Sequence, residues 1–121
     1  MANNAKQPGD VITWTNAGTA VVSGQVVRVG NILGVALVDI ASTASGSVAL
    51  SGVFTVPKVS AAVIAQGESL TWDASAAAFD DNAAAPATGD VTGPPAVAFQ
   101  AAGNGVTSMA VKFTGVPGTV T

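Results

Sequence analysis

The chain has 121 residues, of which only 9% are charged and 49% are hydrophobic, and its formal net charge is −3. Its four basic residues, Lys6, Arg28, Lys58 and Lys112, lie far apart, so they do not form the clustered basic face that nucleic acid binding requires. It contains no Cys and no His, which excludes a disulfide scaffold, thiol chemistry and the usual proton shuttle at neutral pH. We therefore expect a folded protein with no catalytic function and no nucleic acid partner.

The first nine residues, MANNAKQPG, are polar and show no hydrophobic periodicity. They lack the apolar core of a secretory signal, and no apolar run approaches the roughly 20 residues of a membrane helix. We expect a soluble protein that is made in the cytoplasm and has no membrane partner. The predicted organisation is a flexible N-terminal arm at residues 1–9, a single β domain at residues 10–115 and a C-terminal tail at residues 116–121.

From residue 10 onward, hydrophobic and polar residues alternate, and Gly, Pro or Asn interrupts them about every eight to twelve residues, which is typical of short antiparallel strands. Ile12 and Trp14 share one face of the first predicted strand. In the stretch SGQVVRVGNILGVALVDIA, residues 23–41, two apolar strands flank a turn at Gly30 and Asn31. The predicted core positions there are Val27, Val29, Leu33, Val35 and Leu37, with Gln25 and Arg28 facing outward.

The alternating residues at 48–56 predict one long strand that Gly52 can bend. Pro57 ends this strand, because proline cannot donate a main-chain hydrogen bond to the ladder. Residues 59–66 contain helix formers but are too few for a stable helix, so we expect one helical turn or a short crossover. The residues on the inward face of the long strand are Val48, Leu50, Phe54 and Val56.

Leu70 and Trp72 alternate in a further strand, and Asp73 follows as a turn former. Residues 80–95 contain Pro and Gly clusters without a sustained apolar face, which predicts a long loop. Two last strands flank a Gly-Asn-Gly turn at residues 103–105, with Val97, Phe99, Met109, Val111 and Phe113 predicted to face inward. Together the elements predict an all-β fold, a small antiparallel β-barrel or β-sandwich of short strands with at most one short helix.

The carboxylates are densest at Asp73, Asp80, Asp81 and Asp90. Calcium binds oxygen ligands of this kind, but the spacing matches no EF-hand loop. Capping of loops is the alternative role for these side chains, and it is the one we expect. We therefore predict no metal site.

Nucleophilic catalysis lacks a suitable base in this sequence. Without His, only Lys6, Lys58 or Lys112 could activate a Ser, and none lies in an SxxK motif. The glycine-rich segments GNILG and GNG have no following helix or Lys, so they predict β-turns and not phosphate sites. Trp14 and Trp72 could form a binding platform, but their alternating strands favour packing in a core. We predict no catalytic, cofactor-binding or metal-binding residue.

Three ordered stretches carry a family resemblance: residues 23–41, SGVFTVPK at residues 51–58 and IAQGESLTWD at residues 64–73. They closely resemble the small capsid cement proteins of tailed bacteriophages, also called head decoration proteins. The similarity covers about residues 8–113, and three motifs in the same order are more specific than any one of them. The long loop at residues 80–95 and the extension at residues 116–121 depart from the family pattern.

This resemblance implies a non-enzymatic virion protein on the outer surface of the mature head. Many copies would bind the major capsid protein and stabilise contacts between capsomers, as homo-oligomers near local threefold positions, with a trimer as the expected form. The protein would be made in the host cytoplasm and would need no cofactor. Two alternatives remain: another phage component, such as a tail-tube or spike-base domain, or a carbohydrate-binding β-sandwich with Trp14 or Trp72 exposed for stacking on a sugar.

Overall fold

The computed structural model describes residues 10–121, and this part of the chain contains strands and no helix. The predicted arm at residues 1–9 lies outside the described residues. No helix of the described chain is long and apolar enough to cross a membrane. The all-β prediction is confirmed. The strands are β1 Val11–Thr15, β2 Val26–Val29, β3 Ile32–Ala36, β4 Ser45–Ala49, β5 Ser51–Pro57, β6 Thr71–Asp73, β7 Ala78–Asp80, β8 Val91–Thr92, β9 Ala96–Ala98, β10 Ser108–Thr114 and β11 Thr119–Val120.

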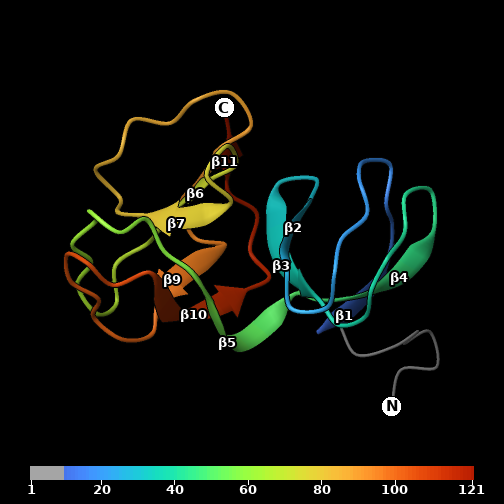
Figure 1. The fold of residues 1–121 in the computed structure, drawn as a ribbon, viewed down its shortest axis with the longest axis horizontal. Coiled ribbons are helices and arrows are strands. Elements are labelled where there is room, and N and C mark those ends of the chain that lie inside the picture. The colour runs from blue at the N-terminus through green and yellow to red at the C-terminus, as the bar shows by residue number, and fades with distance from the viewer. Residues whose placement is uncertain (1–9) are drawn as a thin grey trace, which may run out of the picture.

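The strands form three antiparallel sheets with the orders β1-β4-β3-β2, β5-β10-β9 and β11-β8-β6-β7. In Figure 1 the first sheet lies on the right, and the other two lie on the left, one above the other. The predicted long strand is two strands, because β4 and β5 belong to different sheets and only Leu50 separates them. Gly52 has a φ of 126°, a conformation that favours glycine, and it lies where the chain enters the second sheet.

The β2–β3 hairpin is buried on both faces. Its two-residue turn contains Gly30, whose φ of 60° favours glycine. One face contributes Val26, Leu33 and Val35 to the main core, which lies between the sheets. The opposite face contributes Val27 and Ala36 to a second, smaller core, in which Val29 is partly buried.

The predicted core of this hairpin is therefore correct for Val27, Leu33 and Val35, although they pack into two different cores. Leu37 is wrong as a core position because it is 40% exposed. Strand β3 ends at Ala36, and the chain turns away before Leu37 can continue the inward row. Arg28 and Gln25 are exposed, as predicted.

Aromatic rings connect the second and third sheets inside the main core. Trp72 of β6 packs edge to face on Phe79 of β7, with ring centroids 4.9 Å apart. Phe79 packs on Phe113 of β10, and Phe113 packs on Phe54 of β5, each at 5.9 Å. Such pairs stabilise a core beyond the burial of their area. Two of them join strands that are already hydrogen-bonded, β6 with β7 and β5 with β10, whereas the Phe79–Phe113 pair joins the third sheet to the second.

Strand β10 follows the prediction, since Met109, Val111 and Phe113 are all buried. Its partner β9 does not, because Ala96 and Ala98 are buried while Phe99 is 48% exposed and Val97 is partly exposed. The pairing places Ala96 opposite Phe113 and Ala98 opposite Val111, so the alanines share the inner face with those large residues. The inward assignment of Val97 and Phe99 is wrong for this reason.

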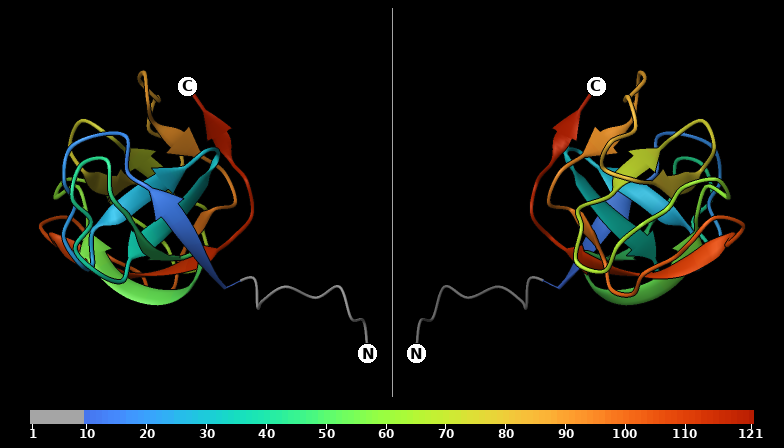
Figure 2. Two further views of the ribbon diagram at one scale, coloured as in Figure 1. Left: turned by 90° about the vertical axis from the view of Figure 1, so that its right-hand side faces the viewer. Right: turned by 90° about the vertical axis from the view of Figure 1, so that its left-hand side faces the viewer.

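The C-terminal segment is part of a sheet and not a free tail. Strand β11 pairs with β8, which itself interrupts the predicted loop at residues 80–95 and also pairs with β6 (Figure 2). The amide of Gly118 donates a hydrogen bond to the carbonyl of Asn31 in the β2–β3 turn, at 2.7 Å. The last residues thus join the third sheet to the hairpin of the first.

Gly118 lies too close to its neighbours to carry a side chain. A Cβ at this position would meet the carbonyl oxygen of Thr92 and would lie 2.6 Å from Cγ of Pro95. We predict that Gly118→Ala lowers the free energy of unfolding by about 1–3 kcal/mol, as overpacking of a close contact does. Denaturant unfolding measures the effect.

Gly103→Ala is the matched control, since nothing lies within 4 Å of a Cβ built there. An equal loss in both variants would show that the contact at Gly118 is unimportant and that only the general effect of replacing glycine was measured.

Candidate binding surface

Lys58 is a buried cation that lies among main-chain carbonyls. Its side chain is 3% exposed, and Nζ donates to the carbonyl oxygens of Val59 at 2.8 Å and Gly103 at 3.0 Å. It also donates to those of Val106 at 3.2 Å and Ser60 at 3.3 Å. A buried ammonium group is tolerated only when hydrogen bonds replace its hydration, and these four oxygens provide them.

These hydrogen bonds hold two long connections together, which we call the hub loops and define as residues 58–68 and 99–107. A main-chain bridge between Ile64 and Ala102 joins them, with hydrogen bonds of 2.8 and 3.0 Å. The amide of Gly105 donates to the carbonyl of Ser60 at 2.7 Å. The region has no helix, so the crossover alternative for residues 59–66 is correct, and the turn at residues 103–105 lies inside a longer connection.

The hub loops expose large apolar side chains above these hydrogen bonds. Val63 is 66% exposed, Phe99 48% and Val106 40%. The charged side chains of these loops are both engaged: Lys58 is buried, and the Glu68 carboxylate accepts hydrogen bonds from the amides of Ala65 and Asn82. The hub loops lie at the end of the molecule away from β1 and β4 (Figure 1). Such a charge-poor apolar surface loses little solvation when a partner covers it.

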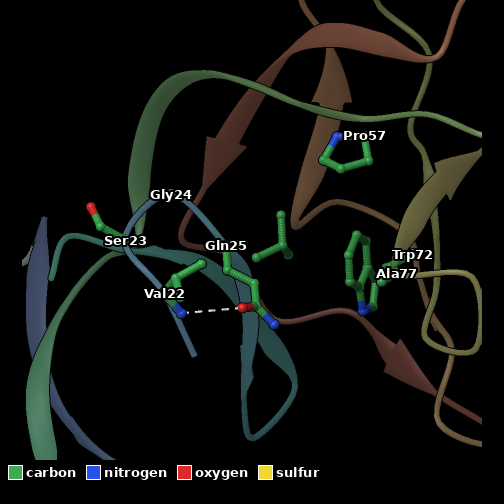
Figure 3. A pocket seen from close by; sticks show the side chains of 8 residues that line it. Val22, Ser23, Gly24, Gln25, Pro57, Trp72 and Ala77 are labelled. Carbon is green, nitrogen blue, oxygen red and sulfur yellow. Dashed lines mark hydrogen bonds between the residues drawn. The ribbon is translucent and has the colours of Figure 1, made fainter. Parts of the chain in front are cut away.

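A second apolar feature is a hollow of about 370 Å³ beside the start of β2. Figure 3 shows Pro57 and the Trp72 ring on one side and Gln25 on the other. The Gln25 side chain is fixed, because its Oε1 accepts a hydrogen bond from the amide of Val22 at 3.2 Å. The full lining consists of Val22, Ser23, Gly24, Gln25, Val26, Pro57, Trp72 and Ala77.

The two tryptophans pack into cores, which agrees with the sequence interpretation. Trp72 is 8% exposed and contacts the ring of Phe79, so it offers little of its face to a sugar. Trp14 is half-buried on β1 and packs against the second core. Neither indole is an open platform of the kind that carbohydrate stacking uses.

The four clustered aspartates serve as acceptors for turns. Asp90 is 4% exposed and accepts hydrogen bonds from the amides of Ala74 and Ala87, at 3.0 and 2.9 Å. Asp80 and Asp81 each accept from an amide close by in the chain. Within residues 10–121, no three carboxylates come together as a possible metal site. These contacts are of the loop-capping kind that the sequence predicts for the four aspartates.

Sequence reasoning missed the structural role of Lys58, which it considered only as a base. The signal was present, because Lys58 has the same parity as Val56 and therefore points inward at the end of β5. Parity predicts direction, whereas the four carbonyl partners come from loops whose course only the fold determines.

Replacing Lys58 tests the importance of this interaction. Lys58→Met keeps an unbranched stem but removes the ammonium donors from four buried carbonyl groups. Those of Val59, Ser60 and Gly103 keep one main-chain hydrogen bond each, from the amides of Ala62, Gly105 and Val106. We expect a loss of about 2–4 kcal/mol in the free energy of unfolding, measured by denaturant titration. Lys112→Met on the exposed face of β10 is the control, and an equally small loss in both variants would contradict the assigned role.

Asp73 is expected to make the stability of the folded protein depend on pH in the acid range. The Ser75 hydroxyl, at 2.8 Å from Oδ1, and the Ala76 amide lower the pKa of this carboxyl below its ordinary value. A pKa lowered by folding adds stability above the pKa of the unfolded chain, and this stability is lost as the pH falls through the folded value. Asp73→Asn should therefore unfold with a shallower pH dependence between neutral pH and about pH 3, as followed by thermal melting. An unchanged slope would contradict the assignment.

The comparisons with known proteins agree with this picture of a binding scaffold. No match is found among curated protein sequences. The family model described as phage cement protein matches residues 6–113, which is nearly the whole chain. The chain therefore belongs to the phage cement protein family, a family of structural phage proteins.

Proposed function

We propose that this protein binds the outer surface of the mature phage head and stabilises contacts between neighbouring capsomers, with the major capsid protein as its partner. The observation that carries the proposal is the charge-poor surface of the hydrogen-bonded hub loops, with Val63, Phe99 and Val106 exposed. Membership of the cement family supports the virion as the location. The proposed role is non-enzymatic and requires no cofactor or nucleic acid.

The physical basis of such a role is linkage. A protein that binds only the assembled, expanded shell stabilises that state by mass action, by an amount that grows with its free concentration relative to its Kd. Rigid loops favour this binding, because little conformational entropy is lost when they are covered. The network of carbonyls around Lys58 therefore supports affinity as well as folding.

We further propose that the protein acts as a homotrimer, with residues 1–9 as an arm that contacts the shell or a neighbouring subunit. Several subunits that engage the shell together gain avidity, so each individual contact can be weak. With only 9% charged residues, the chain has few groups that would need partners in a subunit interface.

Binding to heads tests the function and the surface separately. We expect the purified protein to cosediment with expanded heads of its phage that lack it, and Val63→Asp to reduce occupancy by about tenfold because a buried carboxylate would lack a partner. Val53→Asp is the matched control, since Val53 is also exposed, at 46%, but lies on β5 outside the hub loops.

The outcomes are distinct in this design. Failure of the unaltered protein to bind heads would refute the proposed function. Binding of Val63→Asp that equals that of Val53→Asp would leave the function standing and refute the hub loops as the contact.

Oligomeric state provides a separate check. We expect sedimentation equilibrium to give a mass three times the chain mass of 11.7 kDa, free in solution or after release from heads. A monomer under both conditions would refute the trimer.

A further inference from the structure

Asn104 and Gly105 form the only Asn-Gly pair in the sequence. This dipeptide undergoes spontaneous deamidation when the main-chain nitrogen of the glycine can reach the side-chain carbonyl carbon of the asparagine, because glycine has no side chain to hinder the attack. Both residues are exposed in the hub loops, and Gly105 has a φ of 92° in the turn. Solvent, which supplies the base and the water for the reaction, therefore reaches the pair.

The structure holds the attacking nitrogen in place. The amide of Gly105 donates a hydrogen bond of 2.7 Å to the carbonyl of Ser60. That carbonyl also accepts from Nζ of Lys58, and the carbonyl of Gly103, next to the pair, accepts from Nζ at 3.0 Å. The Val106 amide closes the same turn by donating to Gly103 at 3.2 Å. Attack requires the loss of the Gly105 proton, which the hydrogen bond to Ser60 opposes.

We propose that Asn104 is a deamidation site that the Lys58 network keeps closed in the folded protein. When the turn opens, Gly105 N loses its proton to hydroxide and attacks Cγ of Asn104, and a C–N bond forms. The side-chain nitrogen takes a proton from water, its bond to Cγ breaks, and it leaves as ammonia. Water then opens the resulting succinimide at either carbonyl and yields aspartate or isoaspartate. No oxidant or reductant takes part.

The product changes the surface of the hub loops. A carboxylate appears beside Val106, in a connection whose residues 99–107 contain no charged side chain. Isoaspartate also lengthens the main chain by one carbon at a position between two carbonyls that Lys58 binds, those of Gly103 and Val106. Each event is irreversible, so modified copies accumulate with time spent in the open state.

The experiment compares deamidation of the folded and the unfolded protein. The purified protein is incubated in mildly alkaline buffer with and without guanidinium chloride, and the peptide that contains Asn104 is analysed by mass spectrometry and by an isoaspartate assay. We expect deamidation in the folded protein to be slower by about tenfold or more, because it proceeds only through local opening. Asn104→Gln is the control and should give no product at this position.

Equal rates in the folded and the unfolded protein would overturn the protection. The absence of product at Asn104 in the unfolded chain would overturn the site itself. Lys58→Met tests the role of the network: if it folds, its rate should exceed that of the unaltered protein under native conditions, and an equal rate would overturn the role of Lys58. If it does not fold, hydrogen exchange at the Gly105 amide of the unaltered protein decides, since fast exchange would overturn the protection.

Discussion

The burial of a single ammonium group constrains the two loops that expose Val63, Phe99 and Val106. Lys58 comes at the end of β5, and its inward parity takes a positive charge below the surface. The charge is compensated by carbonyl dipoles of Val59, Ser60, Gly103 and Val106, which belong to segments far apart in the sequence. A carboxylate partner would have satisfied the charge at one point, whereas carbonyls must be brought from several turns. Two long connections without helix or strand are thereby held together.

Charged side chains are also few in the rest of the chain. The aspartates accept hydrogen bonds from main-chain amides and serine hydroxyls, some within the same turn and some from distant segments, as the Ser51 hydroxyl on Asp10. Apolar contacts and main-chain hydrogen bonds also join segments that are distant in the sequence, as the hydrogen bond between Gly118 and Asn31 does. A scaffold of this kind leaves neutral surfaces for partners, which agrees with the family of structural phage proteins to which the chain belongs.

The strands could largely be predicted from alternation. In a strand that is buried on one face, every second residue is apolar, so the pattern indicates which residues face the core. Alternation succeeded for β10, where Met109 and its neighbours face the core. It failed for β9, where the smaller Ala96 and Ala98 are buried and Phe99 is exposed, because cross-strand register decides which parity faces inward. The candidate surface was less predictable. The direction of Lys58 follows from parity, but its partners depend on how loops distant in the sequence meet.

The double burial of the β2–β3 hairpin has a consequence for how the molecule responds to stress. Val26 and Val35 belong to one core, while Val27 and Ala36 belong to the other, so neither core is complete without this hairpin. Damage to either side is therefore transmitted to the other through the backbone of two short strands. The protein should behave as one cooperative unit despite its three sheets, without partly melted forms in which one half persists. For a structural phage protein, this removes a route by which local unfolding at one edge could spread.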